Sequence, residues 1–396
     1  MRRVWGSPPD GDGDDRRIRV CMVTTSLPLG GAESLQLEVL SGVDRDAFRT
    51  EVLCLREPGQ MAERFRAAGV PVTVMGRRRL QHLTTIPVLA RWLARRRIDV
   101  VLLTPHHAAT FLGPPAARLA GVGGTAIGLH QIGGKAIGIP SLPPGGVEML
   151  SMIDMLILLS PAQLDYLREH ERVDSMPWRR VQHAIIPNGV PIGARPRGAE
   201  IAAARDALGL GAGDLVVGCL AALRPEKDHD LLLRAIARLA PAWPALRLAL
   251  VGSGEREDHL RSLAAELGIA DRVLFAGFRD DVARILPAFD VKCLTSIQET
   301  YPVSVLEAMA AGVPVVMTGP EGVPELVQDG VSGFVIPVGD EDALVERLGR
   351  LLSDPGLRAR MGDSAYARAA GEFPVERTLR RYEAVFAHLA GRDPAA

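Results

Sequence analysis

The stretch VKCLTSIQETYPVSVLEAMAAGVPVVMT, residues 291–318, contains a strand, a turn, a helix and a second strand. Its two apolar ends, VKCL and PVVMT, have the short length of buried strands, and the part from Val303 to Gly312 has the length of a helix. Strands that alternate with helices in this way are typical of βαβ units and of a parallel sheet that is covered on both faces. The stretch therefore predicts an α/β fold.

The same alternation continues outward along the chain. One series of strands and helices begins at Arg17 with RIRVCMVTT, and a second series begins with LVVGCLAAL at residues 215–223. Between the two series lies the Pro- and Gly-rich segment AIIPNGVPIGARPR, residues 184–197, which is typical of a linker. The length of 396 residues also suits two domains.

We therefore expect two Rossmann-like, doubly wound domains that face each other across a cleft. The expected parts are a disordered leader at 1–16, an N-terminal domain at 17–190, a C-terminal domain at 191–375, and a closing helix at 376–396 that packs back on the N-terminal domain.

The composition excludes several classes of function. The 46 basic and 47 acidic residues give a formal net charge of −1, so no overall field favours nucleic acid. The cysteines lie in separate apolar runs, which predicts inert buried thiols; they are Cys21, Cys54, Cys219 and Cys293. The N-terminus has no apolar stretch of signal-peptide length, and no segment reaches the about 18 apolar residues of a membrane span. We expect a cytoplasmic protein.

Two glutamates flank the turn in the opening stretch. Glu299 precedes the turn and Glu307 lies about one turn into the following helix. Ligands bind at the carboxyl ends of strands in open α/β sheets, and the free N–H groups of a helix N-terminus favour phosphate oxygens. The two carboxylates are therefore candidates to bracket a phosphorylated ligand. The alternative is one solvated helix glutamate and one loop glutamate.

This glutamate pair carries a family resemblance. The segment ETYPVSVLEAMAAGVPVV resembles the signature of the retaining glycosyltransferases of the GT-B fold, family 4 or glycosyl transferases group 1, which include bacterial mannosyltransferases and sucrose synthase. The resemblance covers residues 17–390 and includes, in the family's order, IIPNGV, LRPEKDHDLLLRAIARL, LVGSGE, VLFAGFRDDVARILPAFDV and GVPELVQDGVSGFVIPVGDEDAL. It implies an acceptor-side N-terminal domain and a C-terminal domain that binds a nucleotide sugar.

The resemblance also implies roles for single residues. Glu307 is expected to hold the ribose of the nucleotide and Glu299 the transferred sugar, while Lys227 is expected to neutralise the diphosphate leaving group. Backbone amides are expected to meet the diphosphate at Pro302, Val303 and Ser304. One position departs from the family, because Ala222 stands where an arginine is usual. Arg224 could supply that charge from the same strand face if the strand extends that far.

Further site residues follow from weaker local matches. Gly30 and Gly31, in LPLGGAES, resemble a glycine-rich loop that lets the backbone approach a ligand, although ordinary turn glycines look the same. His130 matches a histidine that the family places near the donor sugar, so the implied catalytic residues are Glu299, His130 and Lys227. His106 or His107, after the strand VVLLT, is a candidate acceptor contact or a structural histidine.

The segment VGSGE at residues 251–255 has two glycines of a dinucleotide-binding fingerprint and Glu257 in place of the third, which argues against a dehydrogenase. Gly252 is expected in a turn beside the nucleotide, and Phe278 is similar to a residue of the family's base-side loop. The acidic run Asp340, Glu341 and Asp342 opens a helix, where acidic residues suit the dipole. We therefore expect neither a metal nor another cofactor.

Residues 77–97 carry seven arginines interleaved with Leu, Ile and Trp92. This pattern predicts either a basic amphipathic helix that lies on an anionic membrane at the inner face, which would suit a lipid-linked acceptor, or a solvated helix face.

Together these features imply a retaining, metal-independent, hexosyl-type glycosyltransferase of polysaccharide or glycolipid biosynthesis. It would move a sugar from a nucleotide-diphosphate sugar to a hydroxyl of a glycan, a lipid-linked acceptor or a small molecule. Two alternatives stay open: a sugar-nucleotide 2-epimerase of the same architecture, and a non-catalytic nucleotide-binding paralogue, which Ala222 motivates.

Overall fold

A computed structural model describes residues 15–77, 84–130, 141–173, 181–320 and 326–392. The chain forms two compact units, one made of Met1–Asn188 together with Glu376–Ala396 and the other of Gly189–Val375. The observed boundary lies two residues from the expected one. The expected leader at 1–16 lies outside the described residues except for Asp15 and Arg16.

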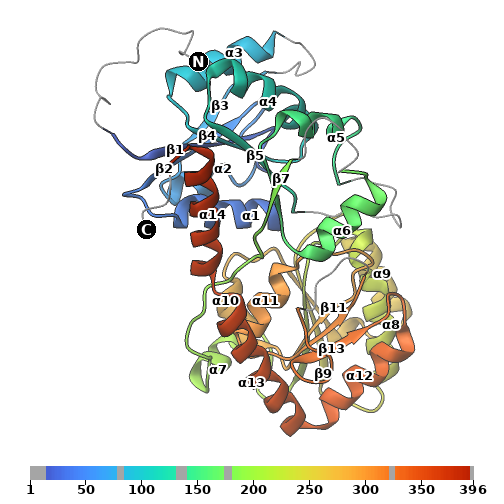
Figure 1. The fold of residues 1–396 in the computed structure, drawn as a ribbon. Helices are drawn as coiled ribbons and strands as arrows, with labels where there is room; N and C mark the ends of the chain where they lie inside the picture. The colour runs from blue at the N-terminus through green and yellow to red at the C-terminus, as the bar shows by residue number, and fades with distance from the viewer. Residues whose placement is uncertain (1–14, 78–83, 131–140, 174–180, 321–325, 393–396) are drawn as a thin grey trace. The chain divides into compact units, whose positions relative to one another are not determined.

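The N-terminal unit is built on a parallel seven-stranded sheet with the order β3-β2-β1-β4-β5-β6-β7 (Figure 1). The strands are β1 (Ile18–Thr24), β2 (Phe48–Cys54), β3 (Val72–Val74), β4 (Val100–Leu103), β5 (Gly124–Gly128), β6 (Met155–Leu158) and β7 (Gln182–Ile185). Its helices are α1 (Gly31–Gly42), α2 (Ala62–Ala67), α3 (Thr85–Arg95), α4 (His107–Ala120), α5 (Gly146–Met149), α6 (Pro161–His170) and α14 (Val375–Leu389).

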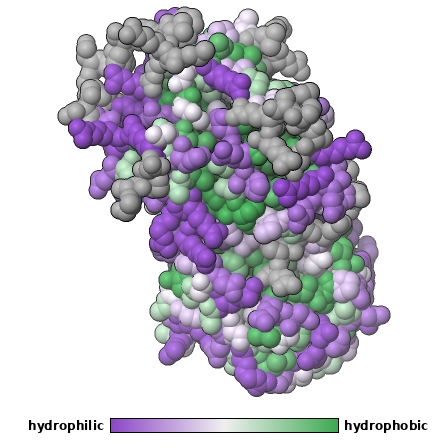
Figure 2. All heavy atoms as spheres, viewed as in Figure 1, coloured by the Kyte–Doolittle hydropathy of each residue, from purple (hydrophilic) through white to green (hydrophobic). Residues whose placement is uncertain are grey.

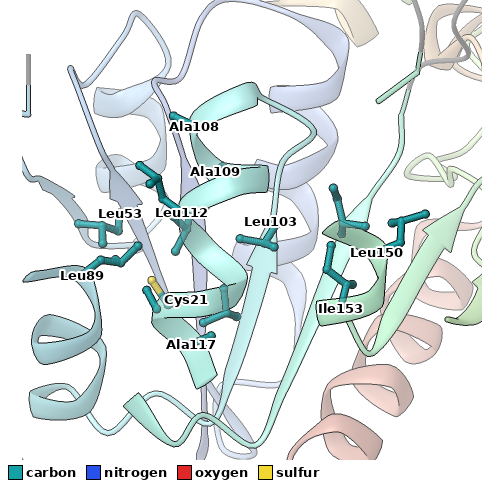
Figure 3. Close-up of a cluster of buried hydrophobic side chains, with 14 of the residues drawn as sticks. Cys21, Leu53, Leu89, Leu103, Ala108, Ala109, Leu112, Ala117, Leu150 and Ile153 are labelled. Atoms are coloured by element: carbon teal, nitrogen blue, oxygen red, sulfur yellow. The ribbon is translucent and has the colours of Figure 1, made fainter. Parts of the chain in front are cut away.

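Aliphatic side chains fill the layer between this sheet and its helices. Figure 3 shows Leu53 and Leu103 from strands β2 and β4 meeting Leu89 of α3 and Leu112 of α4. Cys21 lies in the same layer. All four cysteines are free and buried, as expected, and burial raises the pKa of the Cys54 thiol to about 12.

The C-terminal helix α14 belongs to the N-terminal unit although it is last in the sequence. Tyr382 and Phe386 are fully buried, and the ring of Phe386 meets that of Phe48 edge-on, with 6.1 Å between centroids. Thr378 Oγ1 donates a hydrogen bond of 2.9 Å to the Pro187 carbonyl. These contacts hold helix α14, which follows the C-terminal unit in the sequence, against the N-terminal unit.

The C-terminal unit has a parallel six-stranded sheet of order β10-β9-β8-β11-β12-β13. The strands are β8 (Leu215–Leu220), β9 (Leu246–Val251), β10 (Val273–Gly277), β11 (Val291–Leu294), β12 (Val315–Thr318) and β13 (Gly333–Ile336). Its helices are α7 (Ala199–Asp206), α8 (His229–Leu239), α9 (Glu257–Glu266), α10 (Val282–Ile285), α11 (Val303–Ala310), α12 (Glu341–Ser353) and α13 (Pro355–Glu372). In the face shown in Figure 2, hydrophilic and hydrophobic residues are interspersed over this unit.

The chain runs from β8 outward to β9 and β10 and then returns to β11 on the other side of β8. The loops that follow β8 and β11 therefore diverge at a topological switch point, which is where open α/β sheets bind ligands. No helix in the described part of the chain is both long and apolar enough to cross a bilayer.

Candidate functional site

The loops after β8 and β11 carry two predicted site residues whose side chains are in direct contact. Lys227 ends a short 3-10 turn, Pro225–Lys227, and its Nζ lies 2.6 Å from Glu299 Oε1. Ser296 Oγ donates a second hydrogen bond of 2.7 Å to the same oxygen. The side chains of Lys227 and Glu299 are 21% and 10% exposed, so a ligand can reach a pair that is otherwise largely shielded from water.

Backbone hydrogen bonds hold these two loops against each other. The Ile297 N–H donates to the Glu226 carbonyl at 2.9 Å, and Thr295 Oγ1 donates to the Asp228 carbonyl at the same distance. Asp228 itself has a φ of +43°, a left-handed conformation in which its carboxylate accepts a hydrogen bond from the Leu231 N–H and caps α8. The position of the ammonium relative to the carboxylate is therefore fixed by the fold.

Helix α11 begins beside this pair. Pro302 is its N-cap, with extended backbone and no side-chain cap bond. The expectation that Pro302 donates a backbone amide is wrong, because proline has no N–H. Val303 and Ser304, which are half-buried, do carry N–H groups in the first turn, where an α-helix leaves them without intrahelical partners.

Glu307 lies in the second turn of α11 and is mostly buried. Burial raises the pKa of its carboxyl group to about 7, and the positive charge of Lys292 opposes that rise. The solvated helix glutamate considered from the sequence is thus excluded. The two glutamates of the signature lie in different surroundings, because the Lys227 ammonium is 2.6 Å from Glu299, whereas burial is the main influence on Glu307.

Two buried residues at this site were missed by the sequence analysis. Lys292, in the middle of β11, is fully buried, and burial lowers its pKa. His229, the first residue of α8, is 2% exposed, and its Nε2 has no hydrogen-bond partner among the described residues. Burial first and the charges of Lys292 and Lys227 next lower the pKa of His229 to about 4, so its ring is neutral near pH 7. A lysine inside the apolar run VKCL was the signal available in the sequence.

The remaining C-terminal candidates lie in nearby turns. Strand β8 ends at Leu220, so the alternation argument that would place Arg224 on the face of Ala222 does not apply. Arg224 is exposed, and its N–H closes a turn on the Ala222 carbonyl at 2.9 Å. Gly252 has a φ of +145°, and a β-carbon there would lie 2.0 Å from the Ala221 carbonyl oxygen, so this turn requires glycine. Phe278 follows β10 with 45% of its surface exposed.

The candidates at 30, 31 and 130 belong to the N-terminal unit. Gly30 is the N-cap of α1, where a β-carbon would lie 2.6 Å from a Glu33 carboxylate oxygen, whereas a β-carbon at Gly31 would meet no described atom within 4 Å. His130 lies two residues beyond β5 with its Nε2 against Gln36 Nε2. Its Nδ1 is buried without a partner in the described part of the chain, and burial lowers its pKa to about 4.

His106 is held by two hydroxyl groups at the ends of β1 and β4. Its Nδ1 lies 3.1 Å from Thr24 Oγ1 and 3.2 Å from Thr104 Oγ1. Thr24 donates its proton to the Ser26 carbonyl, and Thr104 donates to Thr24. All four contacts are satisfied only if Nδ1 is the protonated nitrogen, which leaves Nε2 as an acceptor. Burial lowers the pKa of His106 as well.

Asp340 accepts a hydrogen bond of 2.9 Å from the Ala343 N–H and so caps α12, as its place at a helix start suggested. Glu341 forms ion pairs with Arg234 and Arg238 at 2.9 and 3.1 Å. These contacts are those of an acidic helix start that is capped and paired with arginines.

The basic segment is only partly described, since residues 78–83 lie outside the described ranges. Helix α3 is amphipathic, but its apolar side, including Leu89 and Leu93, is packed into the core of the N-terminal unit. That side therefore cannot insert into a membrane as an amphipathic anchor would. Arg91 and Arg95 remain exposed, while Arg96 is bound to Glu51 at 2.7 Å.

Two Rossmann-like units with parallel sheets, the second carrying a charged cluster at its switch point, define the GT-B class of fold. Residues 29–193 match the family model for Glycosyltransferase Family 4, and residues 200–368 match the one for Glycosyl transferases group 1. The chain belongs to this glycosyltransferase family.

Among curated proteins, the chain is similar to the lipopolysaccharide core biosynthesis glycosyltransferase LpsE of Rhizobium meliloti, with 32% identity over 54% of this chain and 59% of that protein. It is also 41% identical to the D-inositol 3-phosphate glycosyltransferase of Stackebrandtia nassauensis over 42% of this chain and 40% of that one. The chain thus matches only part, about 40 to 60%, of the length of these relatives.

Among solved structures, the fold is similar to that of HepE from Anabaena in complex with UDP-glucose, with a TM-score of 0.80 and 23% identity over 93% of this chain and 99% of that one. Sucrose-phosphate synthase from Thermosynechococcus elongatus has a TM-score of 0.75 and 18% identity over 95% of this chain and all of that one.

Proposed function

We propose that this protein transfers a glycosyl group from a nucleoside-diphosphate sugar to an acceptor hydroxyl with retention of configuration. The observation that carries the proposal is the Lys227–Glu299 pair, 2.6 Å apart at the switch point of the C-terminal sheet and next to the start of α11. A diphosphate needs cations and N–H donors, whereas a sugar needs hydrogen-bond acceptors. The pair and the helix start offer both.

Each group has a task in this reaction. The Lys227 ammonium and the N–H groups of Val303 and Ser304 bind the diphosphate and stabilise the negative charge that grows as it leaves. Glu299 accepts hydrogen bonds from the hydroxyls of the transferred sugar, and Glu307 accepts them from the ribose. No side chain of the C-terminal cluster is needed as a nucleophile.

The bond changes occur on one face of the sugar. The bond from the anomeric carbon to the diphosphate oxygen breaks, the acceptor oxygen bonds to the same face of that carbon, and the acceptor proton passes to the departing diphosphate. Because Lys227 supplies the positive charge at the leaving group, the reaction is proposed to need no metal. Activity that is unchanged in the presence of EDTA is the expected result.

The names of the relatives support a sugar-nucleotide donor and a hydroxyl-bearing acceptor. HepE has been crystallised with UDP and with UDP-glucose, and the relatives include proteins named for a lipopolysaccharide core and for D-inositol 3-phosphate. For this chain we propose an acceptor that is a glycan, a lipid-linked sugar or a small polyol, and a role in polysaccharide or glycolipid biosynthesis.

The test measures release of nucleoside diphosphate from UDP-, GDP- and ADP-sugars, with and without candidate acceptors. The variants Glu299→Ala and Lys227→Ala are expected to lose activity. Glu346→Ala, on the exposed side of α12, is the matched control. Unchanged transfer in either site variant would overturn the assigned roles. An isomerised donor that forms without acceptor would identify an epimerase instead. If none of the donors tested is turned over, the non-catalytic paralogue is the remaining reading.

We also propose that contact with a membrane, where it occurs, is peripheral and electrostatic. The apolar side of α3 is used by the core, so only exposed arginines such as Arg91 and Arg95 are available to anionic headgroups.

A further inference from the structure

The N-terminal sheet has a switch point of its own, between β1 and β4. From β1 the chain runs outward through β2 and β3, and it then returns to β4 on the other side of β1 (Figure 1). The two strands pair in parallel, so the loops that follow them start at the same edge of the sheet. Open α/β sheets bind ligands at such a point. A polar atom that lies there without a partner is therefore a candidate to contact a ligand.

Two threonine hydroxyls and one histidine ring meet at this switch point. Thr24 is the last residue of β1, Thr104 directly follows β4, and His106 is the N-cap of α4. Both threonines are buried, while the histidine is half-buried. Nδ1 of His106 lies 3.1 Å from Thr24 Oγ1 and 3.2 Å from Thr104 Oγ1, so one ring nitrogen faces two hydroxyl oxygens.

The protons of these hydroxyls are already used, and this decides the tautomer of the ring. Thr24 Oγ1 donates to the Ser26 carbonyl at 2.9 Å, and Thr104 Oγ1 donates to Thr24 Oγ1 at 3.1 Å. Because a hydroxyl has only one proton, both oxygens can only accept from His106. Nδ1 therefore carries the ring proton and Nε2 keeps its lone pair. Burial lowers the pKa of His106 from its ordinary 6.5, so the ring is neutral near pH 7.

The second ring nitrogen is the atom that a ligand can contact. Nε2 of His106 has no hydrogen-bond partner among the residues that the structure describes, and it is not one of their buried unpartnered polar atoms. A lone pair on a neutral ring accepts a hydrogen bond from a hydroxyl group, whereas it repels the oxygen of an anion. The ligand that fits is an uncharged compound that carries hydroxyl groups.

We propose that Thr24 and Thr104 are positioning residues that hold His106 as the Nδ1–H tautomer, and that Nε2 binds a hydroxyl group of a polyol or sugar. Since this inference rests on the proposed function for the identity of the ligand, the ligand is the acceptor of the glycosyl group. The threonines select the chemistry of the ligand without contacting it. With the opposite tautomer, Nε2 would be a donor and would suit an anionic oxygen.

The tautomer is measured directly by ¹H–¹⁵N NMR of the histidine side chains in the full chain at pH 7.5. The His106→Phe variant identifies the signals of this histidine, because it removes them. In the wild type we expect Nδ1 to carry the proton and Nε2 to carry none. A wild-type ring that is protonated on Nε2 instead would overturn the proposal.

The two threonines give different predictions. Thr24→Val frees the Thr104 proton, which can then turn to Nδ1 and shift the ring toward the Nε2–H tautomer. Thr104→Val leaves the Thr24 proton on the Ser26 carbonyl, so the Nδ1–H tautomer should persist. Thr24→Ser, which keeps the hydroxyl, should give the wild-type spectrum. The matched control is Thr85→Val, because Thr85 is a buried threonine of the same unit whose hydroxyl has no partner in the described part of the chain. An unchanged tautomer in Thr24→Val would contradict the assigned role, since a threonine that only fills space would give that result.

The class of ligand is tested by titration with glycerol, myo-inositol and methyl α-glucoside, and separately with sulfate, an anion without a proton to donate. In the wild type the polyols should shift the Nε2 signal of His106 and sulfate should not. In Thr24→Val the preference for a polyol over sulfate should fall by at least about five-fold, which corresponds to one hydrogen bond. If sulfate shifts the wild-type signal, or if none of the three polyols does, the assigned ligand class is wrong.

Folding of each variant is checked by circular dichroism and thermal unfolding. If Thr24→Val does not fold, the wild-type tautomer and the wild-type titrations still decide the proposal. A protein that transfers a sugar but whose His106 is protonated on Nε2 refutes this inference alone. A protein with the expected tautomer and polyol response that turns over none of the donors refutes the proposed function and leaves the polyol site in place.

Discussion

Glu307→Gln is expected to stabilise the C-terminal unit at pH 8 and not at pH 4. Burial raises the pKa of this carboxyl group from its ordinary 4.5 to about 7 in the folded protein. The folded state therefore binds a proton more tightly than the unfolded state. Between about pH 4.5 and 7 stability is lost as pH rises, and above pH 7 the full penalty of a buried carboxylate remains.

The size of the effect follows from the two pKa values. Their difference of about 2.5, at 1.36 kcal/mol for each pKa unit, amounts to roughly 3 kcal/mol above pH 7. Glutamine has the same shape and no charge, so it avoids this penalty. The measurement is urea unfolding of the wild type, Glu307→Gln and the exposed control Glu346→Gln at pH 4, 6 and 8.

The expected difference in unfolding free energy between Glu307→Gln and the wild type is near zero at pH 4 and largest at pH 8. The control variant should track the wild type throughout. A Gln variant that is less stable than the wild type by the same amount at every pH would refute the reasoning, because it would show that the carboxylate makes favourable contacts that outweigh burial. A stabilised variant that no longer binds UDP would instead identify Glu307 as a residue kept for binding at the expense of stability.

Three further predictions concern other parts of the chain. Lys227→Met should lower kcat/KM for donor turnover by at least about 100-fold, since removal of one group that stabilises a developing anion has effects of that order; a steady-state assay that finds less than a three-fold change would contradict its role. Gly252→Ala should lower the unfolding free energy by more than about 2 kcal/mol. The added β-carbon would lie 2.0 Å from the Ala221 carbonyl oxygen, and the φ of +145° at this position is unfavourable for alanine. An unchanged melting temperature of the variant would contradict this prediction. Flotation with anionic liposomes should be lost at high salt and weakened in an Arg91→Ala, Arg95→Ala double variant; binding that resists salt would indicate an apolar anchor instead.

The sequence predicts the fold well because its signals are local. Apolar runs of strand length that alternate with helices specify a parallel sheet, and the segment from Val291 to Thr318 forms β11, α11 and β12 in that order. The two loops that carry Lys227 and Glu299 could also be expected to meet. Both follow strands, and the carboxyl ends of parallel strands lie at one edge of the sheet.

Burial of charge could not be predicted in the same way. Whether Lys292 faces solvent or core depends on which helix covers its face of β11, and this is decided by α11, which lies after it in the chain. The periodicity of α3 has the same limitation, since it shows an apolar side but not that the core of the N-terminal unit covers it. A pattern of hydrophobic residues gives the orientation of a side chain within its element, while its surroundings depend on tertiary contacts.

The different surroundings of the two glutamates have a consequence for the order of binding. Glu299 is held by Lys227 and Ser296, so its carboxylate is not fully available to a sugar until another anion competes for the ammonium. A diphosphate is such an anion, and when it draws Lys227 away, Glu299 gains the capacity to accept hydrogen bonds from the sugar that the same donor carries. Glu307 is different, because burial rather than an ion pair is the main influence on its carboxyl group. We therefore expect the nucleotide half of the donor to bind to a site prepared in advance, whereas recognition of the sugar depends on the diphosphate. A free sugar without its nucleotide should accordingly bind only weakly.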